Sequence, residues 1–328
     1  MAGRRLRLGF QVWGQYTTWP ELMSAGHDID ELGFDELWSN DHFLPQAAGG
    51  AGELGRLEGP VFEGWSMLFG WAGVTRRARI GCLVSGGGYR NPALLVKMAT
   101  ALDHASGGRA ALGLGAGWFE REHRAFGFDL PPVRERLDRL EDAAAICRGL
   151  LDGATVTHTG AWYSAMDARN DPAPVQARLP LVIGGSGEKR TLRIVARYAD
   201  IWNADGDDPG SFARRSGILD EHCSAVGRDP GGIERTAGLS PPCIRPTRDA
   251  AVEALTEILV QQAMPPDAAR RMAEGSPFAG PSDAVVDVLS RYRAAGLSAA
   301  MFDWPAPFDR PTLEALAGPV RAALDAAV

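Results

Sequence analysis

Apolar positions recur along the chain in two periods. Eight short, almost wholly apolar runs have the composition of buried strands, and the segments between them repeat apolar residues every three or four positions, as amphipathic helices do. The strands are predicted at Leu6–Val12, Glu36–Ser39, Arg79–Val84, Ala110–Leu114, Leu181–Gly184, Asp200–Asn203, Arg235–Leu239 and Ala299–Asp303. Strands that alternate with helices indicate a parallel sheet, and eight such units predict an α/β fold, the (β/α)8 TIM barrel.

Helix ends support this pattern. Thr18 followed by Pro20 predicts a capped helix start, and Gly296 predicts the stop of a helix that begins near Ser282. The clearest helical segments are Trp19–Leu32, Pro92–His104 and Arg134–Leu151. These segments supply the crossover helices that a barrel of parallel strands requires.

Three stretches do not fit the repeat. Pro45–Gly59 is rich in Gly and Ala and reads as a mobile loop, and Asp152–Pro180 reads as an excursion between the fourth and fifth strands. Gln261–Pro281 contains two adjacent prolines and could form a short helical lid. Each stretch follows a strand–helix unit rather than dividing the chain. We therefore expect one domain over residues 1–328.

Bulk properties narrow the class of protein. The chain has 328 residues and a net charge of −7, which argues against a nucleic-acid-binding protein. No run approaches the roughly 18 apolar residues of a membrane helix, and no signal peptide is evident, so we expect a cytoplasmic protein without a membrane partner. The cysteines Cys82, Cys147, Cys223 and Cys243 are scattered, so neither a metal site nor a disulfide is expected.

Glycine-rich turns follow two predicted strands. Gly86-Gly87-Gly88 follows the third strand, and Gly115-Ala116-Gly117 follows the fourth. Glycines there allow a flat or phosphorylated ligand to approach the backbone, although ordinary turns would look the same. The run Gly113–Trp118 resembles the dinucleotide fingerprint, but its third spacing is wrong and no acidic residue follows at the required distance. We therefore expect these glycines to leave room for a planar ring.

A third glycine-rich segment follows the fifth strand and opens a helix. Free backbone N–H groups at a helix start favour a phosphate. Lys189 and Arg190 add positive charge, although both could equally point to solvent. The segment lacks Walker spacing. Its residues are Gly184, Gly185, Ser186 and Gly187.

Asp41 and His42 come directly after the second strand, where a barrel places its chemistry. Histidine gains or loses a proton near neutral pH, so His42 is a candidate acid/base. The alternative is that Asp41 only caps the loop and that His42 is merely hydrogen-bonded within it.

Three segments carry a family resemblance: LGFDELWSNDHF, RNPALLVKMATALDHASGGRAALGLGAGWFEREH and GGSGEKRTLRIVARYADIW. They resemble the luciferase-like monooxygenase superfamily, most closely the branch that uses the deazaflavin coenzyme F420. This implies a luciferase-like TIM barrel, hydride transfer between F420 and a small organic substrate, and often a homodimer. The alternative is a monooxygenase that uses reduced FMN and oxygen. A non-catalytic flavin-binding barrel is disfavoured because His42 and the glycine loops are present.

The resemblance also implies roles for individual residues. His42 would be the acid/base, with Glu120 and His123 as further catalytic candidates, whereas Glu122 reads as part of a solvated helix face. A non-proline cis peptide is implied at Cys82–Leu83, forming a bulge beneath the ring. The implied cofactor contacts are Asp41, Cys82, Leu83, Ser85, Gly115, Gly117, Trp118, Gly184, Gly185, Ser186, Gly187, Trp202 and Asn203.

The tryptophans bear on the substrate. Trp118 stands where several F420-dependent sugar-phosphate dehydrogenases of the superfamily carry a glutamate, which puts sugar-phosphate oxidation in doubt. Trp13, Trp202 and Trp304 lie near predicted strand ends and either wall an aromatic substrate pocket or belong to the core.

Overall fold

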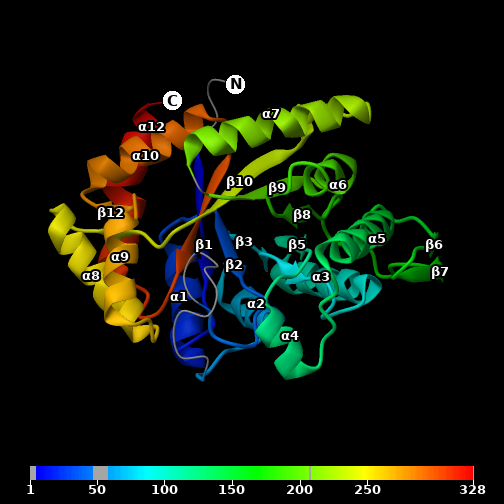
Figure 1. The fold of residues 1–328 in the computed structure, drawn as a ribbon, viewed down its shortest axis with the longest axis horizontal. Coiled ribbons are helices and arrows are strands. Elements are labelled where there is room, and N and C mark those ends of the chain that lie inside the picture. Colours follow the sequence, from blue (N-terminus) through cyan, green and yellow to red (C-terminus); the bar gives the residue numbers. More distant parts are fainter. Residues whose placement is uncertain (1–4, 47–57, 207, 328) are drawn as a thin grey trace.

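The eight predicted strands close into a parallel barrel in the computed structural model, which describes residues 5–46, 58–206 and 208–327 (Figure 1). Each strand pairs with the next along the chain, and β13 pairs with β1 to close the ring. The barrel strands are β1 (Arg7–Val12), β2 (Glu36–Ser39), β3 (Arg79–Cys82), β5 (Ala110–Gly115), β8 (Leu181–Gly184), β9 (Ile201–Asp205), β10 (Glu234–Leu239) and β13 (Ala299–Trp304). The predicted TIM barrel is therefore confirmed, with strand ends that differ by one or two residues.

Helices cover the outside of the barrel (Figure 1). They are α1 (Trp19–Glu31), α2 (Gly64–Val74), α3 (Pro92–Ser106), α4 (Glu120–Phe126), α5 (Val133–Leu151), α6 (Thr191–Tyr198), α7 (Pro209–Ala225), α8 (Arg248–Gln261), α9 (Pro266–Gly275), α10 (Ser282–Ala294), α11 (Arg310–Ala315) and α12 (Arg321–Ala326). Thr18 caps α1 as predicted, and Glu21 completes a capping box with it. Among the described helices, none has the length and apolar character needed to cross a membrane.

The irregular stretches contain local structure. The segment Asp152–Pro180 contains a hairpin of β6 (Val156–Thr159) and β7 (Ser164–Ala168). The segment Gln261–Pro281, which was expected to form a short helical lid, contains α9. Two short strands, β11 (Cys243–Ile244) and β12 (Ala279–Gly280), pair beside α8. Most of the loop predicted at Pro45–Gly59 lies outside the described residues.

Successive side chains of a barrel strand point alternately outward and inward, so the strands contribute to two apolar layers. On β1, Leu8, Phe10 and Val12 face outward and join the large core between the barrel and its helices. Inward-facing side chains, including Trp38 and Met301, fill the middle of the barrel. Because this interior is packed, the inward positions left for a ligand are those at the strand ends.

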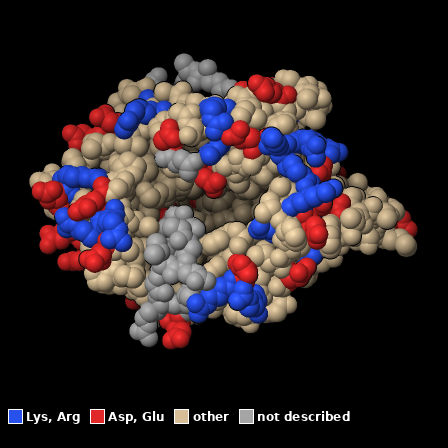
Figure 2. Space-filling model, viewed as in Figure 1, with Lys and Arg blue, Asp and Glu red and all other residues tan. Residues whose placement is uncertain are grey.

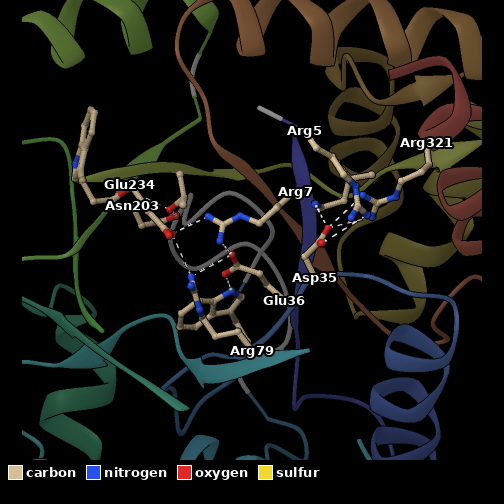
Figure 3. A network of polar contacts seen from close by, with 12 residues as sticks. Arg5, Arg7, Asp35, Glu36, Arg79, Asn203, Glu234 and Arg321 are labelled. Atoms are coloured by element: carbon tan, nitrogen blue, oxygen red, sulfur yellow. Dashed lines mark hydrogen bonds and ion pairs between the residues drawn. The ribbon is translucent and has the colours of Figure 1, made fainter. Parts of the chain in front are cut away.

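The amino-terminal ends of four strands meet in a charge network around the buried carboxyl group of Glu36 (Figure 3). Glu36 lies 3.4 Å from Arg7 and 3.3 Å from Arg79, and Glu234 lies 2.6 and 3.2 Å from the same two arginines. The indole of Trp38 also donates to Glu36. Burial raises the pKa of Glu36, although both arginines oppose that rise. Paired charges thus close this end of the barrel.

Removing one member of this network should be costly. We expect Glu36→Ala to lower the free energy of unfolding by about 3–5 kcal/mol, because two arginines would then share the single carboxylate of Glu234. Urea denaturation measures the loss. The matched control is Glu120→Ala, since Glu120 is exposed and its only ion pair among the described residues is with Arg124, four residues along. Equal unfolding midpoints for the two variants would contradict a stabilising role for the network.

Candidate active site

A cavity of about 780 Å3 opens at the carboxyl ends of the barrel strands. It appears as the hollow near the middle of Figure 2. Its volume lies in the range of small-molecule and cofactor pockets. Residues at or just beyond the ends of β1, β2, β5, β8, β9, β10 and β13 line it. The cavity therefore lies where a TIM barrel carries its chemistry.

Val84 forms part of the cavity floor, and its side chain packs against glycines of the neighbouring strands. A Cβ added to Gly115 would lie 2.5 Å from a Val84 methyl group. Added to Gly113 or Gly184, it would lie 3.0 or 3.1 Å away. Gly113 and Gly115 were predicted to leave room for a planar ring, and Gly184 was predicted to begin the phosphate segment. Gly115 and Gly184 first leave room for Val84, whose side chain then faces the cavity, and Gly113 also leaves room for the carbonyl oxygen of Cys82.

The non-proline cis peptide lies at Leu83–Val84, one bond later than predicted at Cys82–Leu83. The reason lies in the pairing: the N–H of Leu83 still donates to Ser39 in the neighbouring strand at 2.8 Å. Pairing with β5 resumes in the two-residue strand β4 (Ser85–Gly86). The bulge therefore occupies Leu83 and Val84.

Of the predicted contacts in this strand, Leu83 alone lines the cavity. Cys82 is fully buried in the layer between barrel and helices, and burial raises the pKa of its thiol. Ser85 is also buried, and its hydroxyl accepts a hydrogen bond from the Trp65 indole at 3.0 Å. Both residues support the bulge from behind rather than facing the hollow.

Asp41 ties the end of β2 to the turn after the bulge. It lies 2.7 Å from Arg90 and accepts the N–H of Gly86 at 3.1 Å. Burial raises its pKa, although Arg90 and the Gly86 N–H oppose that rise. Its Oδ1 has no hydrogen-bond partner among the described residues. Asp41 lines the cavity, so this oxygen can accept a hydrogen bond from a ligand.

His42 lines the cavity and is held from behind by Glu122. Its Nδ1 lies 3.1 Å from a carboxylate oxygen of Glu122, which also accepts the N–H groups of Phe43 and Leu44 and the hydroxyl of Tyr89. Burial acts to raise the pKa of Glu122, but hydrogen bonds from His42, Tyr89 and Phe43 outweigh it and lower that pKa. An ionised Glu122 therefore fixes the ring, and Nε2 is the nitrogen that remains for a ligand.

The interpretation of Glu122 as part of a solvated face is wrong, because the residue is fully buried. One signal in the sequence was the apolar Phe119 three residues earlier, which is buried on the same side of the chain as Glu122. Glu120 instead is exposed and pairs with Arg124. His123 is buried behind Tyr89, 3.3 Å from its hydroxyl, and does not line the cavity.

The predicted phosphate segment lies at the cavity wall. Gly184 and Gly185 line the cavity, whereas Ser186 and Gly187 continue the loop toward α6. Within the described chain, the N–H groups of Ser186, Gly187 and Glu188 donate to no acceptor. Arginine and lysine side chains gather beside the hollow over α6 (Figure 2).

Trp202 lies behind this loop, not at the cavity. Its indole donates to the carbonyl of Gly185 at 2.9 Å and stacks on Phe212. Neighbouring residues of a strand face opposite sides, so Asn203 lines the cavity while Trp202 faces the helices. The hydroxyl of Thr236 holds Asn203 Oδ1 at 2.8 Å.

Among the three tryptophans considered as pocket walls, Trp13 alone lines the cavity. Trp304 belongs to the outer core, as Trp202 does. Trp13 also packs into a separate apolar cluster, which we call the α8–α9 core. Its other members include Cys243, Leu255, Met264 and Ala269. Trp13 thus connects the cavity wall to the helices that follow β11.

The comparison with known families is decisive, because the profile of luciferase-like monooxygenases matches residues 7–304. The chain belongs to this family. An F420-dependent glucose-6-phosphate dehydrogenase of Microbacterium testaceum is 30% identical over 226 residues, covering 68% of this chain and 64% of that protein. A phthiodiolone/phenolphthiodiolone dimycocerosates ketoreductase of Mycobacterium kansasii is 30% identical over 279 residues, covering 78% and 74%.

Solved structures show the same fold. An F420-dependent secondary alcohol dehydrogenase in complex with an F420–acetone adduct superimposes with a TM-score of 0.79 at 19% identity, covering 98% of this chain and 99% of that one. The F420-dependent tetrahydromethanopterin reductase of Methanopyrus kandleri gives 0.79 at 17% identity, covering 98% and 100%. The luciferase-like barrel of this chain therefore extends over nearly its whole length.

The seating of Val84 can be tested with a pair of substitutions. We expect Gly115→Ala to destabilise the protein by about 1–3 kcal/mol, because the added methyl group overlaps Val84. Adding Val84→Ala to that variant should recover most of the loss, since the shorter side chain vacates the space. Chemical denaturation of the single and double variants measures the coupling. Strictly additive effects would show that the two residues do not compete for one space.

Proposed function

We propose that this luciferase-like protein is an F420-dependent oxidoreductase that transfers a hydride between the deazaflavin and a small organic substrate. The observation that carries the proposal is His42, which faces the cavity while the buried Glu122 fixes its other nitrogen. Two relatives at 30% identity support it, one named as an F420-dependent dehydrogenase and the other as a ketoreductase.

The cavity has parts that suit a deazaflavin. Leu83 and Val84 offer an apolar platform for a planar ring, and the unengaged N–H groups of Ser186 and Gly187 suit a phosphate. When bound, F420 would supply the hydride chemistry, which no side chain of the protein can supply. The residues proposed to hold it are Asp41, Leu83, Val84, Gly115, Gly117, Gly184, Gly185, Ser186, Gly187 and Asn203.

His42 is the proposed acid/base. With Nδ1 held by Glu122, Nε2 takes the hydroxyl proton of an alcohol substrate, or gives a proton to a carbonyl oxygen in the reverse direction. Glu122 acts through His42: it accepts the hydrogen bond of Nδ1 and so orients the ring with Nε2 toward the cavity. Cys82, Ser85 and Trp202 become supporting residues, and neither Glu120 nor His123 retains a proposed catalytic role.

The proposal also covers the oligomeric state of the protein and its location in the cell. A cytoplasmic homodimer is the arrangement that the family resemblance favours. Light scattering coupled to size-exclusion chromatography decides between a monomer and a dimer.

Cofactor choice separates the two enzyme classes. Reduced FMN and oxygen would define a monooxygenase, and F420 a dehydrogenase or reductase. We expect F420 to bind with low-micromolar affinity or better and FMN at least about tenfold more weakly, a difference of about 1.4 kcal/mol. Fluorescence titration with each cofactor measures both affinities. Equal or tighter binding of FMN would favour the monooxygenase.

The roles of His42 and Glu122 predict a pattern of rates. His42→Ala should lower kcat by about 10²–10⁴-fold, and Glu122→Gln by about tenfold or more, with little change in F420 affinity. The double variant should fall no further than His42→Ala, because Glu122 acts through His42. Steady-state kinetics and F420 titration of each variant measure these effects, with Glu120→Gln as the exposed control.

The pH dependence of the pair follows from Glu122. Because its pKa is lowered, the stability that it contributes is present above the ordinary glutamate pKa and is lost only as pH falls through the lowered value. Between about pH 6 and 8 Glu122 stays ionised, so a kinetic titration in that window does not belong to it.

The double variant decides whether Glu122 acts through His42. If the losses of kcat in His42→Ala and Glu122→Gln add in the double variant, Glu122 has a role independent of His42.

A further inference from the structure

Trp118 presents an indole at the cavity beside the proposed acid/base. Its ring stacks on Phe119, with centroids 5.0 Å apart and planes 17° apart, so one face is covered. The centroid of the His42 ring lies 5.6 Å away. Even so, Trp118 lines the cavity and 42% of it is exposed. An apolar ligand group that packs against this indole would remove its remaining surface from water.

The charges of the residues that line the cavity also favour an uncharged ligand. Among the described lining residues there is no lysine or arginine, whereas Asp41, Asp205 and Asp303 all contribute carboxylates. Arg90, which neutralises Asp41, does not itself line the cavity. Recognition of a phosphate or carboxylate by side chains normally uses arginine or lysine. The described walls offer an anionic substrate no such partner.

Apolar side chains complete the described wall. Trp13, Leu83 and Leu239 line the same cavity as Trp118, from β1, the bulge and β10. Uncharged polar side chains, among them Gln11, Asn203 and Ser240, line the cavity as well. The described wall therefore offers a neutral substrate both an apolar surface and hydrogen-bond partners for its reacting oxygen.

We propose that the substrate is an uncharged ketone or secondary alcohol with an apolar body that packs on Trp118, and that Trp118 determines this specificity. The proposal rests on the proposed function, because it takes His42 as the group that meets the reacting oxygen. It assigns Trp118 to the substrate rather than to the cofactor. It also separates this chain from relatives named for glucose 6-phosphate.

A matched pair of probes tests the charge preference. 4-Methylacetophenone and 4-acetylbenzoate have nearly the same shape and differ by one negative charge. Ligand-observed NMR titration of the F420-loaded protein gives both dissociation constants. We expect the neutral ketone to bind at least about tenfold more tightly.

Substitutions test Trp118 itself. Trp118→Ala should weaken 4-methylacetophenone binding about tenfold, and Trp118→Phe should retain affinity within about threefold, because an aromatic face remains. The matched control is Trp162→Ala: Trp162 is 41% exposed, but it lies after β6 beneath Arg139 and does not line the cavity. F420 affinity should stay within about threefold in every variant.

Several results would overturn the proposal. They are equal or tighter binding of 4-acetylbenzoate, failure of both probes to bind, and unchanged probe affinity in Trp118→Ala. A loss of F420 affinity in that variant without a loss of probe affinity would assign Trp118 to the cofactor. If the wild-type protein does not bind F420, the proposed function fails, and the same titration without cofactor still decides the substrate class.

Discussion

The cavity depends on how one side chain, that of Val84, fits against three strand glycines. Neighbouring strands lie about 4.8 Å apart, so a side chain that leans from the bulge across β5 and β8 needs bare backbone beneath it. The bulge also sets the position of Gly86, whose N–H holds Asp41. The floor of the cavity and the carboxylate at the end of β2 are therefore placed by the same contact.

Two buried glutamates show how surroundings decide the state of a carboxyl group. Glu36, at the amino-terminal end of the barrel, has a raised pKa although two arginines lie beside it. Glu122, at the opposite end, has a lowered pKa because N–H, O–H and imidazole groups converge on it. Direct hydrogen bonds thus outweigh burial at one site, and burial outweighs ion pairing at the other. The first carboxylate closes the barrel, and the second orients His42.

The fold was accessible from the sequence because strand and helix periods differ and because buried parallel strands are nearly uninterrupted apolar runs. The same alternation could have placed Trp202 correctly: with Asn203 facing inward, its neighbour must face outward. Glu122 was missed because its partners, Phe43 and Tyr89, lie far away in sequence and the charged run around it resembles a solvated helix. Contacts between distant strand ends have no local signature.

Trp13 couples the cavity to a second apolar core. It belongs to the α8–α9 core and yet forms part of the cavity wall. A change in the packing of α8 or α9 can therefore alter the cavity without touching the bulge or Glu122. The described residues of these two helices do not line the cavity, so they act on its shape through the single side chain of Trp13.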